Sequence, residues 1–237
     1  TSTATVTVNV VEVSASATAT PSTPVCSGTS VTLDAGGVAG GVPTYSWTST
    51  PAGTYPATAS ITVNPTETTT YTVTVTDGCS NVATSTVTVT VNPLPTIGVT
   101  PTSTSICQPG ATPATLTADG ATTYTWAPST GLSSSVGTAV DASPASTTTY
   151  TVTATNSLGC SKTQTFVIIV HPLPNLNITA TPSHTTCIGN DVTLTASGAS
   201  SYSWQPGNVT GNSILASASA IGTSVYTVTG TTIHGCT

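Results

Sequence analysis

Hydrophobic and polar residues alternate along most of this chain. Val87, Val89 and Val91 alternate with threonines, and Phe166, Ile168 and Val170 take the corresponding places in the second half of the chain's pattern. A period of two places every second side chain on one face of a β-strand. No window has a competing helical period, and turns rich in Gly, Pro and Ser recur about every 8–12 residues, which is typical of an all-β fold. The chain is therefore predicted to consist of short antiparallel β-strands.

Three copies of one sequence unit follow one another. Each copy contains a cysteine, a Thr-Leu strand, a Tyr-x-Trp motif, a Tyr-Thr-Val-Thr strand and a Gly-Cys pair, and equivalent residues are 76 to 81 positions apart. The recurring residues are the first cysteines Cys26, Cys107 and Cys187, the tryptophans Trp47, Trp126 and Trp204, the tyrosines Tyr71, Tyr150 and Tyr226, and the second cysteines Cys79, Cys160 and Cys236. Roughly seven short strands in about 80 residues predict an antiparallel β-sandwich of immunoglobulin type in each copy. The six aromatic residues are predicted to pack in the three cores, because buried aromatic rings dominate such cores.

The repeat also predicts the domain boundaries. The predicted immunoglobulin-like domains are residues 10–92, 93–173 and 174–237, the last of them incomplete, and residues 1–9 form an additional strand. The joints read Asn92-Pro-Leu-Pro95 and His171-Pro-Leu-Pro174. Two prolines in four residues predict short, stiff hinges.

The charge of the chain narrows the classes of partner. Only 3% of the residues are charged and the net charge is −6, with Lys162 as the single basic residue apart from the histidines. This composition excludes the basic surface that nucleic acid requires and the lysine and arginine clusters that anionic membranes attract. No apolar run approaches the roughly 18 residues of a membrane helix. We therefore expect no nucleic-acid partner and no membrane span.

The motifs of the first unit resemble a known type of repeat. The segments Cys26-x-Gly-x-x-Val-Thr-Leu-x-Ala35 and Tyr71-Thr-Val-Thr-Val-Thr-Asp-Gly-Cys79, with Tyr-x-Trp between them, resemble PKD-like, immunoglobulin-type repeats of secreted Bacteroidota surface proteins, including gliding adhesins and type IX-secreted proteins. The resemblance implies a stalk, a spacer or an adhesive fibre at the bacterial cell surface. The second unit departs from the pattern at Cys107-Gln-Pro-Gly and at Asn156, and the third has no closing strand.

Six cysteines at repeated positions predict disulfides and an extracellular location. In the expected topology, the two cysteines of one unit lie at opposite ends of the sandwich, roughly 20–25 Å apart by the rise of a strand. A disulfide requires Cα atoms within about 7 Å, so head-to-tail stacking favours bonds between neighbouring units. The predicted pairs are Cys26–Cys160, Cys107–Cys236, and Cys187 with Cys79 of a following copy; pairing within each unit through a different strand path is the alternative.

Residues 1–9 repeat the closing strand of the first unit. They match residues 84–92 at 8 of 9 positions, whereas the third unit has no such strand after Cys236. A sandwich without its closing strand exposes an apolar groove and a free strand edge, which can bind a strand of another chain. Burial of Ala4, Val6 and Val8 would contribute roughly 4–6 kcal/mol before ordering costs. The predicted joining strand comprises Thr3, Ala4, Thr5, Val6, Thr7 and Val8.

Two hypotheses explain this displaced strand. In the first, the strand completes the third unit of an adjacent copy, and the open-ended contact generates a filament. In the second, the sequence is a window of one long array, and the flanking repeats of the same chain supply the missing parts. Both hypotheses give the same architecture.

Candidate chemistry is sparse in this sequence. The seven acidic residues are scattered over the three units, and the three histidines fall in separate turns and hinges. Calcium between domains would need clustered carboxylates. We therefore expect no enzyme activity, no cofactor and no metal site. The alternative function is an adhesin or carbohydrate-binding module that uses the loops 48–56 and 128–137, with Tyr55 as the candidate aromatic contact for possible glycans.

Overall fold

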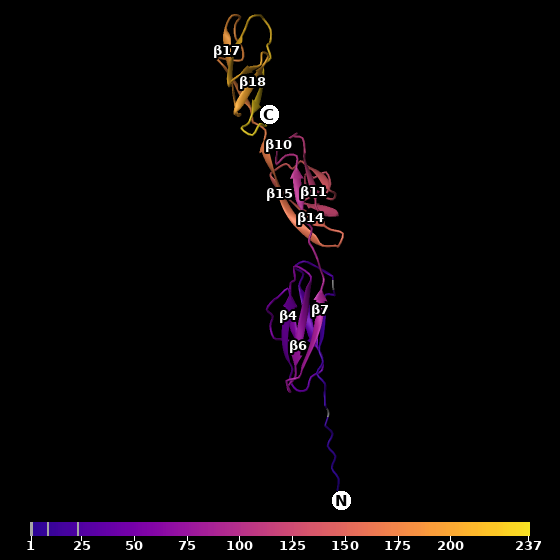
Figure 1. The fold of residues 1–237 in the computed structure, drawn as a ribbon. Coiled ribbons are helices and arrows are strands. Elements are labelled where there is room, and N and C mark those ends of the chain that lie inside the picture. Colours follow the sequence, from indigo (N-terminus) through magenta and orange to yellow (C-terminus); the bar gives the residue numbers. More distant parts are fainter. Residues whose placement is uncertain (1, 9, 23) are drawn as a thin grey trace. The chain divides into compact units, whose positions relative to one another are not determined.

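The computed structural model describes residues 2–8, 10–22 and 24–237. Within these residues the chain is entirely β, with no helix, and the strands form several small sheets (Figure 1). Each sheet draws its strands from only one of the three repeat units, so the chain is a tandem series of immunoglobulin-like β-sandwiches. The predicted fold class is confirmed at this level. No helix of the described residues is long and apolar enough to cross a membrane.

The chain divides into two compact units. The first unit contains residues 1–97, 120–122 and 154–162, and the second contains residues 98–119, 123–153 and 163–237. The hairpin loop of the second repeat, around Cys160, thus belongs to the same compact unit as the first sandwich. The repeat boundaries 10–92, 93–173 and 174–237 stay predictions.

The first sandwich pairs the sheet β1-β3-β5 with the sheet β4-β6-β7. Its strands are β1 (Ser16–Thr20), β2 (Val25–Cys26), β3 (Val31–Gly36), β4 (Thr44–Thr50), β5 (Ser60–Val63), β6 (Thr69–Thr76), β7 (Val82–Val89) and β8 (Val91–Asn92). Every second residue of β6 is buried, as the period of two requires. The short strand β2 pairs in parallel with β8, which continues the closing strand β7.

The second sandwich has the same plan with a longer closing strand. Its strands are β9 (Gly98–Pro101), β10 (Ser105–Gln108), β11 (Ala114–Asp119), β12 (Thr123–Ala127), β13 (Ala139–Ala142), β14 (Thr148–Thr155) and β15 (Ser161–Pro172). The sheets are β13-β11-β9 and β10-β15-β14-β12, so the closing strand β15 has a neighbour on each side.

In the third sandwich, the sheet that contains Trp204 has shorter strands than its counterpart in the first sandwich. Its strands are β16 (Asn177–Thr181), β17 (Asp191–Ser197), β18 (Ser201–Gln205), β19 (Val209–Thr210), β20 (Ser213–Ser217) and β21 (Thr227–Thr231). The sheets are β16-β17-β20 and β19-β18-β21. Among the described residues, β21 pairs with β18 on one side and with no strand on the other.

The predicted aromatic residues lie in or against the cores, with one difference between the repeats. The three tryptophans are each at most 4% exposed. Each indole N–H donates to a backbone carbonyl at 2.9 to 3.0 Å, which satisfies the polar atom of a buried ring. Tyr71 and Tyr150 are buried, whereas Tyr226 of the third sandwich is only half-buried.

Candidate functional site

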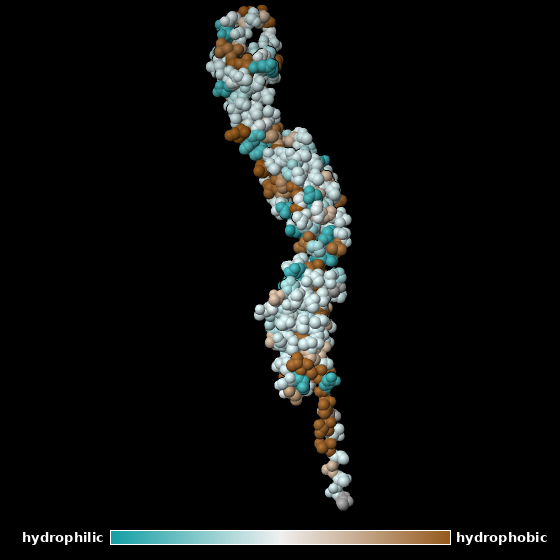
Figure 2. Space-filling model, viewed as in Figure 1, coloured by the Kyte–Doolittle hydropathy of each residue, from teal (hydrophilic) through white to brown (hydrophobic). Residues whose placement is uncertain are grey.

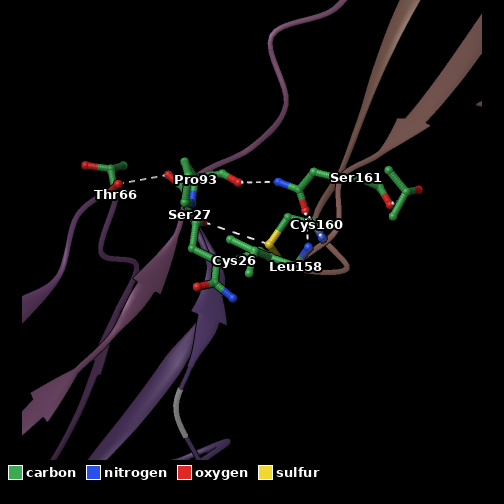
Figure 3. Close-up of a disulfide and its surroundings, with 10 residues drawn as sticks. Cys26, Ser27, Thr66, Pro93, Leu158, Cys160 and Ser161 are labelled. Carbon is green, nitrogen blue, oxygen red and sulfur yellow. Dashed lines mark hydrogen bonds between the residues drawn. A yellow bond between two sulfur atoms is a disulfide. The ribbon is translucent and has the colours of Figure 1, made fainter. Parts of the chain in front are cut away.

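A disulfide joins the first sandwich to the hairpin loop of the second repeat. Cys26 at the end of β2 is bonded to Cys160, with the two Cα atoms 5.5 Å apart (Figure 3). The side-chain amide of Asn156, in the same hairpin loop, donates to the carbonyl of Pro93 at 2.8 Å. Cys160 is fully buried. The bond and the hydrogen bond together fix the hairpin loop on the first sandwich.

A second disulfide repeats this arrangement one sandwich further along. Cys107 in β10 is bonded to Cys236, again with the Cα atoms 5.5 Å apart. The rings of His171 and His234 stack beside it, with centroids 3.7 Å apart. Both bonds have the pairing that strand order predicts, and each joins the first cysteine of one repeat to the hairpin of the next.

The hairpins that carry the second cysteines share one backbone pattern. In each, the residue that begins the loop donates its N–H to the carbonyl four positions later: Asp77 to Asn81, Asn156 to Cys160, and Thr232 to Cys236. The fourth residue of each loop has a positive φ, at Ser80, Gly159 and Gly235. Asn81 therefore occupies the position that Cys160 and Cys236 hold, and Cys79 lies two residues earlier.

This register differs from the one that the repeated Gly-Cys pairs predict. The sequence contained the signal, because the spacing from the repeat tyrosine to the second cysteine is 8 in the first unit and 10 in the other two. The consequence is that Cys79 lies at the hairpin tip, where Leu158 and His234 lie in the other hairpins.

Two cysteines have no disulfide partner in this chain. Cys79 and Cys187 are free and exposed. The other four cysteines are all bonded, so the chain presents one free first cysteine and one free second cysteine.

The third sandwich is open where the others are closed. Val89 of β7 and Ile168 of β15 are fully buried and belong to the closing strands. No described residue takes their place beside β21. As a consequence Leu194 is half-buried, while its counterparts Leu33 and Leu116 are 0% exposed.

The predicted joining strand lies free of the sandwiches. Residues 2–8 are exposed and form no strand, and residues 1 and 9 of the prediction lie outside the described residues. Val6 is 88% exposed and Val8 78%. Figure 2 shows hydrophobic residues gathered along this N-terminal segment. By the sequence match, Val6 corresponds to Val89.

The candidate sugar-binding loop does not present a free aromatic ring. Tyr55 packs edge-on against Tyr71 with centroids 5.6 Å apart, and its hydroxyl shares a 2.8 Å hydrogen bond with the hydroxyl of Ser49. Burial is the main cause that raises the pKa of Tyr71, and the nearby Tyr55 raises it further. Burial also raises the pKa of Tyr150.

Within the described residues, no three His, Cys, Asp or Glu side chains are grouped so that they could hold a metal ion.

Comparison with known proteins finds structural likenesses only. No protein family and no curated protein matches the chain. The chain is similar to the eight N-terminal immunoglobulin domains of the Down Syndrome Cell Adhesion Molecule, at 12% identity and a TM-score of 0.42, over 83% of this chain and 29% of that one. It is also similar to a 1.5-MDa bacterial ice-binding adhesin, at 14% identity and a TM-score of 0.32, over 87% of this chain and 86% of that one.

A third likeness is to a glucan-binding structure. The SGBP-B protein of the mixed-linkage glucan utilization locus of Bacteroides ovatus, in complex with a heptasaccharide, matches at 13% identity and a TM-score of 0.25, over 92% of this chain and 65% of that one. With TM-scores below 0.5, these similarities decide nothing about this chain.

Proposed function

We propose that this chain is a structural segment of an extracellular filament or stalk at a bacterial cell surface, without catalytic activity or a cofactor. Its sandwiches are joined head to tail by strand complementation and by disulfides. The partner is a further copy of the chain, and flanking PKD-like repeats of one longer chain would be joined in the same way. The disulfides support an extracellular location, because such bonds persist in oxidising environments.

One observation carries this proposal. Fully buried Val89 and Ile168 complete the first two sandwiches, and no described residue stands at this place beside β21 in the third. Exposed Val6 stands at the matching position of a near-identical strand. An unpaired strand edge is a template for another strand. Burial of Val6 in the third sandwich of a neighbour would supply the missing core residue of that sandwich.

The test is assembly of the purified chain, measured by light scattering and electron microscopy. The wild-type chain is expected to form open-ended oligomers. Val6→Asp is expected to abolish them, because a charge would have to be buried without a partner. Val136→Asp is the matched control, since Val136 is also an exposed valine, 60% exposed, but lies in a loop of the second sandwich. Monomeric wild-type protein, or equal assembly of the two variants, would contradict the proposal.

A further inference from the structure

The closing strand of a complete sandwich lies between two neighbours. In the second sandwich, β15 pairs with β14 on one side and in parallel with β10 on the other, where Ile106 is opposite Val170. In the first, β7 pairs with β6, and its continuation β8 pairs in parallel with β2, where Val25 is opposite Val91. A closing strand therefore lies in a slot between two neighbouring strands. We call β6 and β14 the first wall of this slot, and β2 and β10 its second wall.

Both walls are incomplete in the third sandwich. Residues 224–226 correspond to the first three residues of β6 and β14, yet they lie outside β21. Residues 185–187 correspond to residues 24–26, which contain β2, and to the first three residues of β10, yet they form no strand and are exposed. By contrast, Val25 and Ile106 are buried. The two differences lie on opposite sides of the same strand position, so they define a slot and not merely one free edge.

We infer that residues 2–8 of a neighbouring copy enter this slot and pair with both walls, and that this pairing positions Cys187 for a disulfide with Cys79 of the same neighbour. The inference rests on the proposed function and adds the second wall and the order of events. By the register of the complete sandwiches, Ala4 lies opposite Tyr226 and Val8 lies opposite Thr186. The strand on the second wall then extends to Cys187, as β2 extends to Cys26.

The linkers explain why one neighbour supplies both the strand and the thiol. After each closing strand the chain is held against a glycine of the next sandwich. A Cβ at Gly120 would lie 1.7 Å from the carbonyl oxygen of Thr96, and a Cβ at Gly198 would lie 2.0 Å from that of Asn175. The same contact holds the N-terminal linker, where a Cβ at Gly37 would lie 2.0 Å from the carbonyl oxygen of Ser14.

The three linkers are almost equal in length. The chain runs four residues from position 92 to 96 and from 171 to 175, and five from position 9 to 14. A first sandwich that follows an inserted strand is thus tethered as the second and third sandwiches are in this chain. At those two joints the hairpin cysteine of the following sandwich is bonded to the first cysteine of the preceding one. The tip of the β6–β7 hairpin, with Cys79, is therefore brought to Cys187.

The bond itself is an oxidation of two thiols. Cys79 and Cys187 lose two protons and two electrons, and a disulfide oxidant such as glutathione disulfide takes them up and becomes two thiols. Both cysteines are exposed in the free chain and accessible to the oxidant. Strand entry precedes the bond, because the segment around Cys187 forms no strand by itself and becomes one only by pairing with the inserted strand.

The second wall is tested by cysteine trapping in the full chain with Cys79→Ser and Cys187→Ser. Neighbouring strands are about 4.8 Å apart, within the range of a disulfide, so Val8→Cys with Thr186→Cys is expected to link copies in high yield. Thr5→Cys with Thr186→Cys is displaced by three residues, about 10 Å, and is expected to link at least about fivefold less. Assembly that occurs with equal or no linkage of the two pairs would overturn the two-walled slot and leave the proposed function standing. Absence of assembly would overturn the proposed function itself.

The order of events is tested with all six native cysteines in a glutathione redox buffer. Non-reducing peptide mapping of the wild-type chain is expected to yield a Cys79–Cys187 peptide between copies. Val6→Asp is expected to yield at least tenfold less of this peptide and to leave both thiols reactive toward N-ethylmaleimide, whereas Val136→Asp behaves as the wild type. Equal amounts of the linked peptide in wild type and Val6→Asp would show that the bond forms without strand entry and would contradict the inference.

Discussion

Single side-chain oxygens organise the hairpins that carry the second cysteines. Oδ1 of Asp77 accepts the backbone N–H groups of Cys79 and Asn81, each at 2.8 Å. Oδ1 of Asn156 plays the same part in the second repeat, and the hydroxyl of Thr232 accepts the N–H of Cys236 in the third. Three residue types thus serve one structural role. Asp77 is the only one of the three that ionises, so the first hairpin depends on pH through this side chain.

Acid is expected to weaken the first hairpin. The side-chain hydrogen bond from Asn81, together with the backbone N–H groups of Asn81 and Cys79, lowers the pKa of Asp77 from 3.8 despite its partial desolvation. Since the folded state favours the charged form, the stabilisation is complete above the unfolded pKa and is lost as the pH falls below about 4 through the lowered pKa. The amide resonances of Cys79 and Asn81 should titrate in NMR with a midpoint below 3.8. Asp77→Asn should remove this titration, and an unchanged titration in that variant would contradict the assignment.

At the scale of elements, the closing strand completes each core. Val89 and Ile168 are 0% exposed, and the alternate residues of these strands face solvent. Because side chains alternate between the two faces of a strand, a shift of one residue in register would move the buried side chains to the solvent face. The closing strand therefore completes the core only in one register. The half-buried Tyr226 and Leu194 of the third sandwich show the effect of an absent closing strand on the residues that it would cover.

Two adjacent isoleucines of β15 should differ sharply in their contribution to stability. Ile168→Ala is expected to lower the free energy of unfolding of the second sandwich by about 2–5 kcal/mol, because it creates a cavity in a closed core. Ile169 is 44% exposed on the other face, so Ile169→Ala should change it by no more than about 1 kcal/mol. Denaturant unfolding of the two variants measures the difference. Equal losses would mean that the register of β15 is wrong.

The sequence predicted the elements better than the loops. The alternation of valine and threonine is a local property, so it predicted the all-β fold and the buried faces of the strands. The pairing of Cys26 with Cys160 followed from strand order alone. The position of Cys79 did not follow, because the similar Gly-Cys pairs concealed a loop register that the hydrogen bonds of Asp77 determine. The packing of Tyr55 against Tyr71 depends on the path of a loop without periodicity, which no pattern in the sequence encodes.

At the scale of the whole molecule, the cysteines form a directional series. Each bonded first cysteine belongs to one repeat and each bonded second cysteine to the next, with sequence separations of 134 and 129 residues. The series leaves Cys79 of the first repeat and Cys187 of the third unpaired. A chain with one free cysteine of each kind can continue the same pairing in both directions. Thiol reactivity therefore distinguishes this arrangement from pairing within each repeat.

Alkylation of the monomeric Val6→Asp chain without reductant should label Cys79 and Cys187 and no other cysteine. These two are exposed and free, whereas the other four are held in disulfides. Of those four, Cys160 is fully buried and Cys236 is almost fully buried. Proteolysis of the alkylated chain followed by mass spectrometry should then give two linked peptides, Cys26–Cys160 and Cys107–Cys236, which separate only after reduction. A linked Cys26–Cys79 peptide would contradict the directional series, because it would close the first repeat on itself and leave Cys160 unpaired. Since neither labelled thiol lies within a bonded pair, the same digest of the wild-type assembly should differ from that of the variant only in the peptides of Cys79 and Cys187, apart from the peptide that carries the substituted residue 6.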